Sequence, residues 1–456
     1  MRQERIRQAK FYSRRTMLQA SCLSAIGSGI HLTENIEAVS HKPTAKSCIL
    51  LFMIGGPSQQ DTFDLKPNAP TEIRGEFNPI ATTVPGTQIS EHLPKLASIA
   101  DDYTLVRSMY HSGSNFHAAG VHYNLTGWPH APRAGQPFLS RRDTPSIGSV
   151  LTQLEGRRDR QKRHALPTSI HLPMYITQDG AGTEWAGQHA GYLGQKYDPF
   201  FMDYKGEMPG GLPNDFVPSV ENAGKRLNYR AKLLEALNKE SKVAREESKR
   251  FQQVQNEGLS VLGESPDWQA FCLDDEPEIM RSRYGDTHFG RSCLVARRLV
   301  EKGVRFVTVT WPITKEYTHF DTHAGNYPTM RKNLPLVDQS VSALIVDLKQ
   351  RGMLDETLIV YTSEFGRTPV INPNGGRDHW PNVYTTMLAG GGVRSGMVYG
   401  SSDKHAAEPK DNAVHVRDFV ATIYHALGYD RNTRVTDYAG RPHFVVHGKP
   451  VRSLLR

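Results

Sequence analysis

The sequence predicts an α/β protein whose mostly parallel central sheet is covered by helices on both faces. Strand-length apolar runs alternate along the chain with helical stretches, which is the pattern of a parallel sheet. The runs are apolar at nearly every position, as strands buried on both faces are. With 456 residues, 38% of them hydrophobic, the chain can form one large α/β domain with insertions, or two domains.

The predicted elements follow one another in a regular order. Strands are expected at 47–55, 103–109, 168–173, 305–311, 357–363 and 383–389. Helices are expected at 117–125, near 147–154, and at 220–255, 289–303, 336–351 and 416–427. The helical stretches carry apolar residues at helical spacing, and several stop at a glycine. Residues 67–94 are rich in Pro and Gly, which favours a loop or a two-strand excursion.

The N-terminal residues indicate export. Residues 13–19, SRRTMLQ, contain a twin-arginine pattern, and a short, weakly apolar stretch follows at 20–30. This combination is typical of a bacterial export signal, and a disordered basic tail is the alternative. We expect residues 1–40 to be a signal and linker used by the twin-arginine (Tat) export machinery, and the protein to be periplasmic or extracellular. The stretch is too short to span a bilayer, so we expect no transmembrane segment in the mature protein.

Charge and cysteine content argue against a nucleic-acid partner, a disulfide framework and a thiolate metal site. Residues 1–15 hold six basic residues and one acidic residue, which accounts for +5 of the net charge of +8. The rest of the chain carries about +3, without a basic stripe, so no nucleic-acid partner is expected. The four cysteines have no CxxC spacing, which argues against a disulfide framework and against a thiolate metal site.

Metal-ligand residue types follow two of the predicted strands. Glu364 follows the strand at 357–363, and Asp378 and His379 come after a Gly-Gly turn. Asp321 and His323 follow the strand at 305–311. Ligands of open α/β sheets bind beyond the carboxyl ends of the strands, so these residues predict a metal site. For any single histidine, the alternative is an ordinary hydrogen-bonded or surface position.

Six blocks of sequence stand out along the chain: FMIGGPSQQDTFD, HSGSNFHAAGVHYNLTGW, LVARRLVEKGVRFVTV, FDTHAGN, TSEFGRTP and GGRDHWP. Together, and in this order, they resemble the DUF1501 proteins. These are exported bacterial proteins of unassigned activity that are related to sulfatases and alkaline phosphatases. The resemblance covers about residues 47–450 and implies an alkaline-phosphatase-like fold, with one domain over 45–456 and an insertion around 178–285.

The resemblance also locates departures from the superfamily pattern. In the superfamily, the nucleophile is the first residue of the helix that precedes a Thr-Gly pair. Thr126-Gly127 matches that pair here, and the corresponding helix position is His117. Phosphatases have Ser or Thr at this position, and sulfatases have a modified Cys. His117 can be a metal ligand, an acid/base group or a nucleophile, and we favour the first two roles. Phe365 stands where phosphatases have a histidine. Gly55-Gly56 replaces the usual Asp, and Asp61 lies a few residues on.

The expected cofactor is a divalent metal ion, Zn, Mn or Fe in preference to Ca or Mg, because the ligands mix carboxylate and imidazole. Arg367 is expected to hold a tetrahedral anion, or else to form a salt bridge with Glu364 or Asp378. The expected ligands are Asp321, His323, Glu364 and His379, with Asp378 as an outer partner or alternate ligand and Asp61 as a further candidate.

These expectations lead to two functional hypotheses. The first is an exported metal-dependent hydrolase of sulfate or phosphate esters, acting on a small-molecule or polysaccharide anionic ester. The second is a catalytically silent metal-binding or assembly protein that retains the same fold.

Overall fold

The computed structural model describes residues 41–111, 115–130, 139–158, 166–177, 184–204, 208–210, 266–314 and 318–456. The predicted signal (1–40), the predicted helix at 220–255 and most of the predicted insertion lie outside these residues, so these expectations stay predictions. The chain divides into two compact units. One contains Met1–Asn35 and Asn214–Gln269, of which the structure describes only 266–269. The other contains Ile36–Pro213 and Ala270–Arg456 and is described below.

The second unit is built on a nine-stranded sheet with the strand order β12-β4-β11-β8-β1-β7-β5-β6, in which β15 also pairs with β4. Its strands are β1 (Ser47–Phe52), β4 (Tyr103–Tyr110), β5 (Ser169–Leu172), β6 (Phe200–Phe201), β7 (Phe306–Thr310), β8 (Thr357–Thr362), β11 (Tyr384–Ala389), β12 (Met397–Tyr399) and β15 (Val414–His415). Strand β11 runs antiparallel to both of its neighbours, and the other pairings of this sheet are parallel. The predicted α/β class with a mostly parallel sheet is confirmed.

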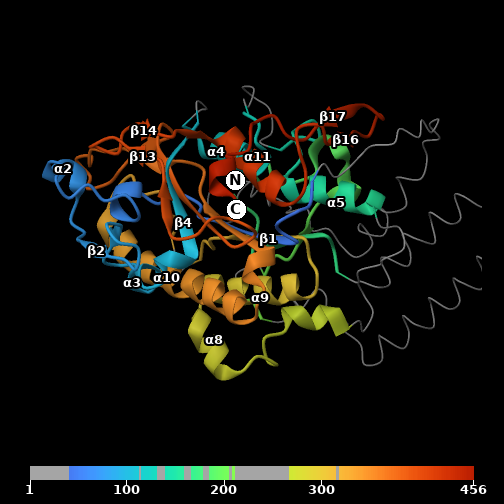
Figure 1. Cartoon of the computed structure of the whole chain (residues 1–456), viewed down its shortest axis with the longest axis horizontal. Coiled ribbons are helices and arrows are strands. Elements are labelled where there is room, and N and C mark those ends of the chain that lie inside the picture. Colours follow the sequence, from blue (N-terminus) through green and yellow to red (C-terminus); the bar gives the residue numbers. More distant parts are fainter. Residues whose placement is uncertain are drawn as a thin grey trace, which may run out of the picture. The chain divides into compact units, whose positions relative to one another are not determined.

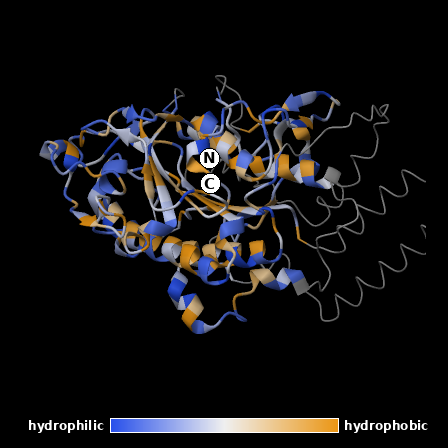
Figure 2. Ribbon diagram, viewed as in Figure 1, coloured by the Kyte–Doolittle hydropathy of each residue, from blue (hydrophilic) through white to orange (hydrophobic). Residues whose placement is uncertain are grey.

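Helices cover both faces of the sheet. In Figure 1, α9 and α10 lie on one side of it, and α4, α5 and α11 lie on the other. Figure 2 shows hydrophobic residues along the strands, and hydrophobic and hydrophilic residues alternating along the helices. The helices are α2 (Thr71–Arg74), α3 (Pro94–Ala97), α4 (His117–Thr126), α5 (Ile147–Arg158), α8 (Glu278–Tyr284), α9 (His288–Glu301), α10 (Asn326–Gln350) and α11 (Val416–Ala426).

The three central strands end level with one another. In the registers of β1 with β7 and with β8, Phe52 lies opposite both Thr310 and Thr362. Every residue of these strands is buried, because the strands lie between two helical layers. The segments that leave the three strands therefore emerge at the same edge of the sheet.

Short elements complete the unit. Its smaller antiparallel pairs are β2 (Pro79–Ala81) with β3 (Gln88–Ser90), β9 (Gly366–Arg367) with β10 (His379–Trp380), β13 (Ser401–Ser402) with β14 (Pro409–Asp411), and β16 (Arg434–Thr436) with β17 (Pro442–Phe444). The 3-10 helices of this unit are η1 (Gln59–Asp61), η2 (Ala100–Asp102), η3 (Gly191–Leu193), η4 (Gln195–Tyr197), η6 (Leu354–Glu356) and η7 (Arg452–Leu454). A further one, η5 (Pro266–Phe271), begins in the first unit and ends in the second. The pairing of β2 with β3 confirms a two-strand excursion within 67–94.

One helix differs clearly from its predicted bounds. Helix α10 begins at Asn326, well before the predicted start at 336, and Pro335 lies inside it. A proline removes one helical hydrogen bond and usually marks a helix boundary, which explains the late predicted start.

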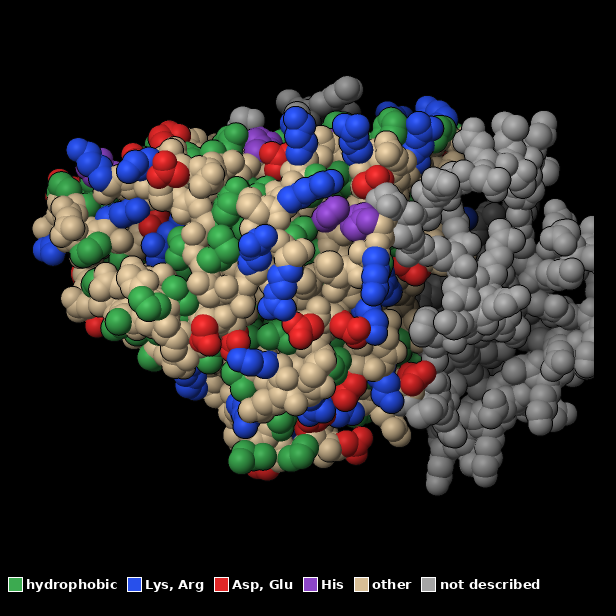
Figure 3. Space-filling model, viewed as in Figure 1, with side chains coloured by type: hydrophobic (Ala, Val, Ile, Leu, Met, Phe, Trp, Pro, Cys, Tyr) green, Lys and Arg blue, Asp and Glu red, His purple; other side chains and the backbone are tan. Residues whose placement is uncertain are grey.

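The distribution of charge and the hydropathy of the helices bear on the expectations about nucleic-acid binding and membrane spans. On the face shown in Figure 3, basic and acidic side chains of the described residues are interspersed. Among the described residues, no helix is both long and apolar enough to cross a membrane.

Candidate metal centre

Three histidines surround the carboxylate of Asp321. Its Oδ2 atom lies 3.0 Å from Nε2 of His117. Its Oδ1 atom lies 3.0 Å from Nε2 of His379 and 3.1 Å from Nε2 of His323. The donor atoms of His117, Asp321 and His379 all lie within 4.8 Å of one another. The same nitrogen of each imidazole therefore faces one carboxylate.

The level strand ends bring these residues together from distant parts of the sequence. His117 is the first residue of α4, Asp321 and His323 lie beyond the end of β7, and His379 lies on β10. The segment with Asp321 passes close to the end of β1 because a glycine stands there. Gly55 has a φ of +99°, and a Cβ atom on it would lie 2.3 Å from the backbone nitrogen of Asp321.

The second nitrogen of each histidine is held by a different acceptor. Nδ1 of His117 lies 2.6 Å from Oε1 of Glu364, and Nδ1 of His323 lies 2.6 Å from Oδ1 of Asp378. Nδ1 of His379 donates to the carbonyl of Asn115 at 2.6 Å. Metal-binding histidines are usually held in this way, with the second N–H donated to a carboxylate or a carbonyl.

The spacing of the inner nitrogens fits a bound cation. Nε2 of His323 lies 3.0 Å from Nε2 of His379. If both imidazoles carry their proton on Nδ1, both Nε2 atoms present a lone pair at this short distance, and a proton shared by them or a metal ion held by both nitrogens would relieve the repulsion. A donor set of imidazole nitrogens with one carboxylate suits Zn, Mn or Fe.

Glu364 lies behind His117 and does not face Asp321. Its side chain is buried, and Oε1 accepts hydrogen bonds from the backbone N–H of Gly55 at 2.7 Å and from His117. Oε2 has no hydrogen-bond partner among the described residues. The backbone carbonyl of Glu364 is held as well, by His111 at 2.9 Å and Asn124 at 3.1 Å. Glu364 therefore orients the His117 ring.

Aromatic side chains pack against the histidine rings. The ring of Phe365 lies 5.0 Å from that of His117 and 4.5 Å from that of His379, measured between centroids. Trp185 stacks on His117 at 5.6 Å with an angle of 14° between the planes. Phe365 and Trp185 are both buried, so they shield this side of the cluster from water.

Arg367 does not offer a free fork to a substrate. Its side chain is buried, and each of its nitrogens donates to the protein. Nε donates to Gly56 O at 3.0 Å, Nη1 donates to Arg377 O at 2.9 Å, and Nη2 donates to Gly55 O and, at 2.6 Å, to Oδ1 of Asp321. The expected salt-bridge partners were Glu364 or Asp378; the structure places Asp321 there. Arg367 therefore orients Asp321.

Asp61 is not brought to the histidines. Its oxygens accept hydrogen bonds from Arg377, with Nε 2.9 Å from Oδ2 and Nη2 3.2 Å from Oδ1. Asn326 donates to Oδ2 at 2.9 Å, and Ser58 donates to the same oxygen. Since Arg377 and Asp61 are both fully buried, this pair is a buried ion pair that fixes the turn before Asp378.

The charges of the cluster favour a cation. Burial lowers the pKa of His117, but the neighbouring Asp321 and Glu364 outweigh this effect and raise it to about 9. Burial raises the pKa of Asp321, but His117, His379 and Arg367 hold it well below its usual range. Nε2 of His117 is close enough to Asp321 for an ion pair, although it makes no well-directed hydrogen bond there.

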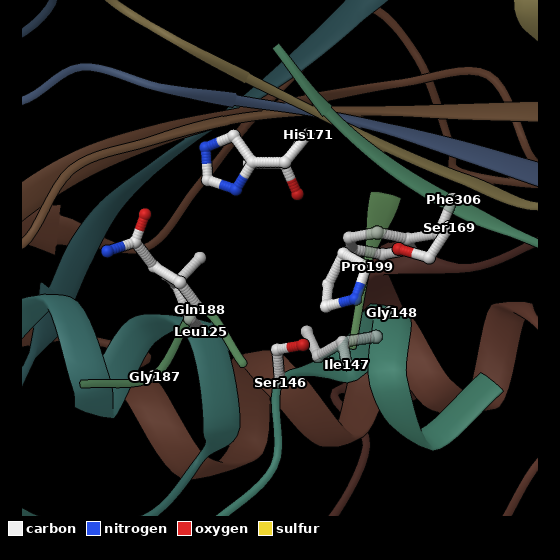
Figure 4. Close-up of a pocket in the computed structure, with 11 residues that line it drawn as sticks. Leu125, Ser146, Ile147, Gly148, Ser169, His171, Gly187, Gln188, Pro199 and Phe306 are labelled. Carbon is white, nitrogen blue, oxygen red and sulfur yellow. The ribbon is translucent and has the colours of Figure 1, made fainter. Parts of the chain in front are cut away.

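A separate cavity lies beside β5. Figure 4 shows His171, Ser169 and Gln188 among the residues that line it. Its volume of about 10 Å³ has room for about one water molecule, which is far too small for an ester.

Sequence patterns identified the ligand types but not two residues that shape the site. Asn115 contributes its backbone carbonyl, which any residue has, so no sequence signal marks it. Trp185 lies in the aromatic and Gly-rich stretch after 178, and nothing in that stretch distinguishes it from a core tryptophan.

Comparison with known proteins places these features in context. The model of the family described as "Protein of unknown function (DUF1501)" matches residues 45–455. No curated protein matches. The PsFucS1 sulfatase from Pseudoalteromonas sp. is 14% identical, with a TM-score of 0.39 over 91% of this chain and 72% of that one.

Two further solved structures are similar to a comparable degree. A protein in the alkaline phosphatase superfamily from Vibrio parahaemolyticus is 12% identical, with a TM-score of 0.36 over 93% of this chain and 81% of that one. The alkaline phosphatase from the Antarctic bacterium TAB5 is 14% identical, with a TM-score of 0.39 over 86% of this chain and the whole of that one.

Proposed function

This chain belongs to the DUF1501 family, whose function is unknown, and we propose that it is an exported metal-dependent hydrolase of sulfate or phosphate esters. The observation that carries the proposal is the convergence of three histidine Nε2 atoms on Asp321, with each Nδ1 held by a separate acceptor. The ester class comes from the sequence resemblance to sulfatases and alkaline phosphatases.

The proposed ligands are Nε2 of His117, His323 and His379, together with the carboxylate of Asp321. Glu364, which was expected as a ligand, is proposed as the group that orients His117, and Asp378, which was expected as an outer partner or alternate ligand, as the group that orients His323. Asp61 is left out of the ligand set because Arg377 binds both of its oxygens. The ion is of the Zn, Mn or Fe class.

When bound, such an ion polarises an ester oxygen and lowers the pKa of bound water. Other residues of the chain orient the proposed ligands and exclude water from part of the site. Arg367 fixes the carboxylate of Asp321, and Glu364 fixes the tautomer and orientation of His117. Phe365 and Trp185 exclude water from one side, which strengthens the electrostatic interactions of the site. With Nδ1 on Glu364 and Nε2 turned to Asp321, His117 has no free nitrogen for use as a nucleophile.

Metal analysis tests the ligand assignment. The full chain, purified without added metal and then loaded with Zn, Mn or Fe in turn, is expected to retain one of these ions through gel filtration. His379→Ala is expected to lose it. His425→Ala is the matched control, because His425 stacks on His41 and contributes nothing to the cluster. Equal metal retention by both variants would contradict the proposed site.

Activity is tested next on p-nitrophenyl sulfate and p-nitrophenyl phosphate. Turnover that requires the metal and is lost in His379→Ala supports the hydrolase. A protein that retains its metal but hydrolyses neither ester, nor any polysaccharide ester offered to it, supports the catalytically silent metal-binding protein instead. Export is tested by replacing Arg14 and Arg15 with lysine, which is expected to keep the protein in the cytoplasm.

A further inference from the structure

We infer that His319 is a substrate-binding residue of this site: its Nε2–H donates a hydrogen bond to an oxygen of the phosphoryl or sulfuryl group of the ester. The inference rests on the proposed function, because it takes that group to lie at the histidine cluster. It gives His319 the contact with the anion that the sequence pattern predicted for Arg367.

His319 lies next to Asp321, whose carboxylate is at the centre of the cluster. The backbone N–H of Asp321 donates to Nδ1 of His319 at 3.1 Å. The same backbone nitrogen lies close to Gly55, where a Cβ atom would be only 2.3 Å away, and the N–H of Gly55 donates to Oε1 of Glu364. The imidazole of His319 is therefore one hydrogen bond from a proposed ligand residue and near the group that orients His117.

The charges of the cluster also reach His319. Burial lowers the pKa of its imidazole. The carboxylates of Asp321 and Glu364 raise this pKa, and the positive charges of His117 and Arg367 lower it. Because electrostatic influence decreases with distance, the ring lies within reach of both the ligands and the groups that orient them.

The hydrogen bond from Asp321 fixes which nitrogen of His319 carries the proton. Nδ1 accepts an N–H, so the proton of the neutral imidazole is on Nε2. Nε2 makes no hydrogen bond with the described residues, and it is not among their buried atoms without a partner, so it is open to solvent. His319 therefore presents an unused donor.

The other three histidines of the site have no nitrogen to spare. In His117, His323 and His379, Nε2 faces Asp321 and Nδ1 has its own acceptor. A metal ion held by those Nε2 atoms leaves none of their N–H groups for an ester oxygen. His319 has the opposite arrangement, with the protein at Nδ1 and an N–H at Nε2, which suits an acceptor and not a metal ion.

The backbone on either side of His319 is fixed. The carbonyl of Thr318 accepts from Nε1 of Trp311 at 3.0 Å. The backbone N–H of Phe320 donates to the carbonyl of Ile54 at 3.0 Å. A donor that is held in place before the substrate arrives loses little conformational freedom on binding, so more of its interaction energy contributes to affinity.

A tetrahedral anion at the cluster needs a donor of this kind. Arg367, the expected partner of the anion, donates each of its side-chain nitrogens to the protein. A hydrogen bond to a charged oxygen changes affinity by about 10- to 100-fold. The free N–H of His319 therefore accounts for part of the binding of the phosphoryl or sulfuryl group.

Two variants separate the free donor from the local hydrogen bond. His319→Asn keeps an acceptor for the N–H of Asp321, as asparagine does in turns, but does not reach the position of Nε2. His319→Gln places an amide N–H near that position. The probes are inorganic phosphate and sulfate, titrated by calorimetry into the metal-loaded full chain and into each variant. We expect His319→Asn to keep its metal and to bind both anions about 10- to 100-fold more weakly, and His319→Gln to recover part of this loss.

Controls keep the outcomes distinct. His425→Asn is expected to bind both anions as the unaltered chain does, because His425 stacks on His41 and contributes nothing to the cluster. Unchanged anion affinity in His319→Asn, or an affinity in His319→Gln no better than in His319→Asn, would overturn the role of His319 as a donor. Loss of metal in His319→Asn that explains the loss of anion binding would also overturn it, since the role would then be local and structural. If the metal-loaded unaltered chain binds neither anion, the proposed ester site itself is wrong, and the inference falls with it.

Discussion

The Arg367→Lys variant tests whether Arg367 orients Asp321 or binds the substrate anion. Three separate nitrogens of the guanidinium donate to four acceptors, which are three backbone carbonyls and the carboxylate of Asp321. A lysine ammonium donates from a single atom and cannot replace this arrangement. At least two acceptors then lose their donor inside the protein, where each such loss costs about 1–3 kcal/mol. The expected destabilisation is therefore roughly 2–6 kcal/mol.

The measurement is thermal and denaturant unfolding of the unaltered chain and of Arg367→Lys, with metal content determined in parallel. We expect the variant to unfold at a lower temperature and to hold its metal less tightly, because Asp321 is no longer fixed. Arg434→Lys serves as the control, since Arg434 lies over the Phe444 ring on the surface hairpin. A variant as stable as the unaltered chain, with its metal retained and only phosphate or sulfate binding lost, would show that Arg367 contacts the substrate anion.

Three further predictions concern neighbouring and distant groups. Glu364→Gln is expected to lower metal affinity about 10–100-fold in competition with a chelator, because the amide holds His117 less strongly; unchanged affinity would contradict its orienting role. Gly55→Ala is expected to lose metal and stability, since its Cβ would overlap the backbone of the ligand segment; a metal-replete, fully stable variant would refute the close approach. Burial raises the pKa of Asp437, but hydrogen bonds, first among them that of His443, outweigh this and lower it to about 2. Because the pKa of Asp437 is lower in the folded state than in the unfolded state, the ionised carboxylate stabilises the fold. This stabilisation is fully present above about pH 4 and is lost as the pH falls through about 2. The melting temperature of Asp437→Asn should therefore be lower than that of the unaltered chain at neutral pH, and the difference should become smaller as the pH falls. A difference that stays constant with pH would contradict the lowered pKa of Asp437.

The sequence predicts the central sheet well because its strands carry a simple signal. β1 and β8 contain apolar runs, β7 combines Phe and Val with two threonines, and buried strands of a parallel sheet between two helical layers are typically made of such β-branched and apolar residues. Helix α10 is predicted less well, because Pro335 carries a local signal for a boundary and tertiary packing overrides it.

Residue types in the sequence identify candidate ligands of the site, but they do not show which of these side chains face the cluster. Asp321 and His379 stand out because carboxylate and imidazole follow strand ends. The direction in which a carboxylate points is set by packing: Glu364 faces the outer nitrogen of His117, and Asp61 faces Arg377. Neither direction is encoded in spacing along the chain, so ligands and orienting groups are separated only in three dimensions.

X-ray absorption spectroscopy of the zinc-loaded full chain tests the proposed metal centre most directly. With His117, His323, His379 and Asp321 as ligands, the spectrum should show nitrogen and oxygen neighbours at about 2.0–2.1 Å, with the outer-ring scattering of three imidazoles. His323→Ala should reduce the imidazole contribution to two rings. A shell of oxygen atoms alone, a sulfur neighbour, or a spectrum that His379→Ala leaves unchanged would contradict the assignment.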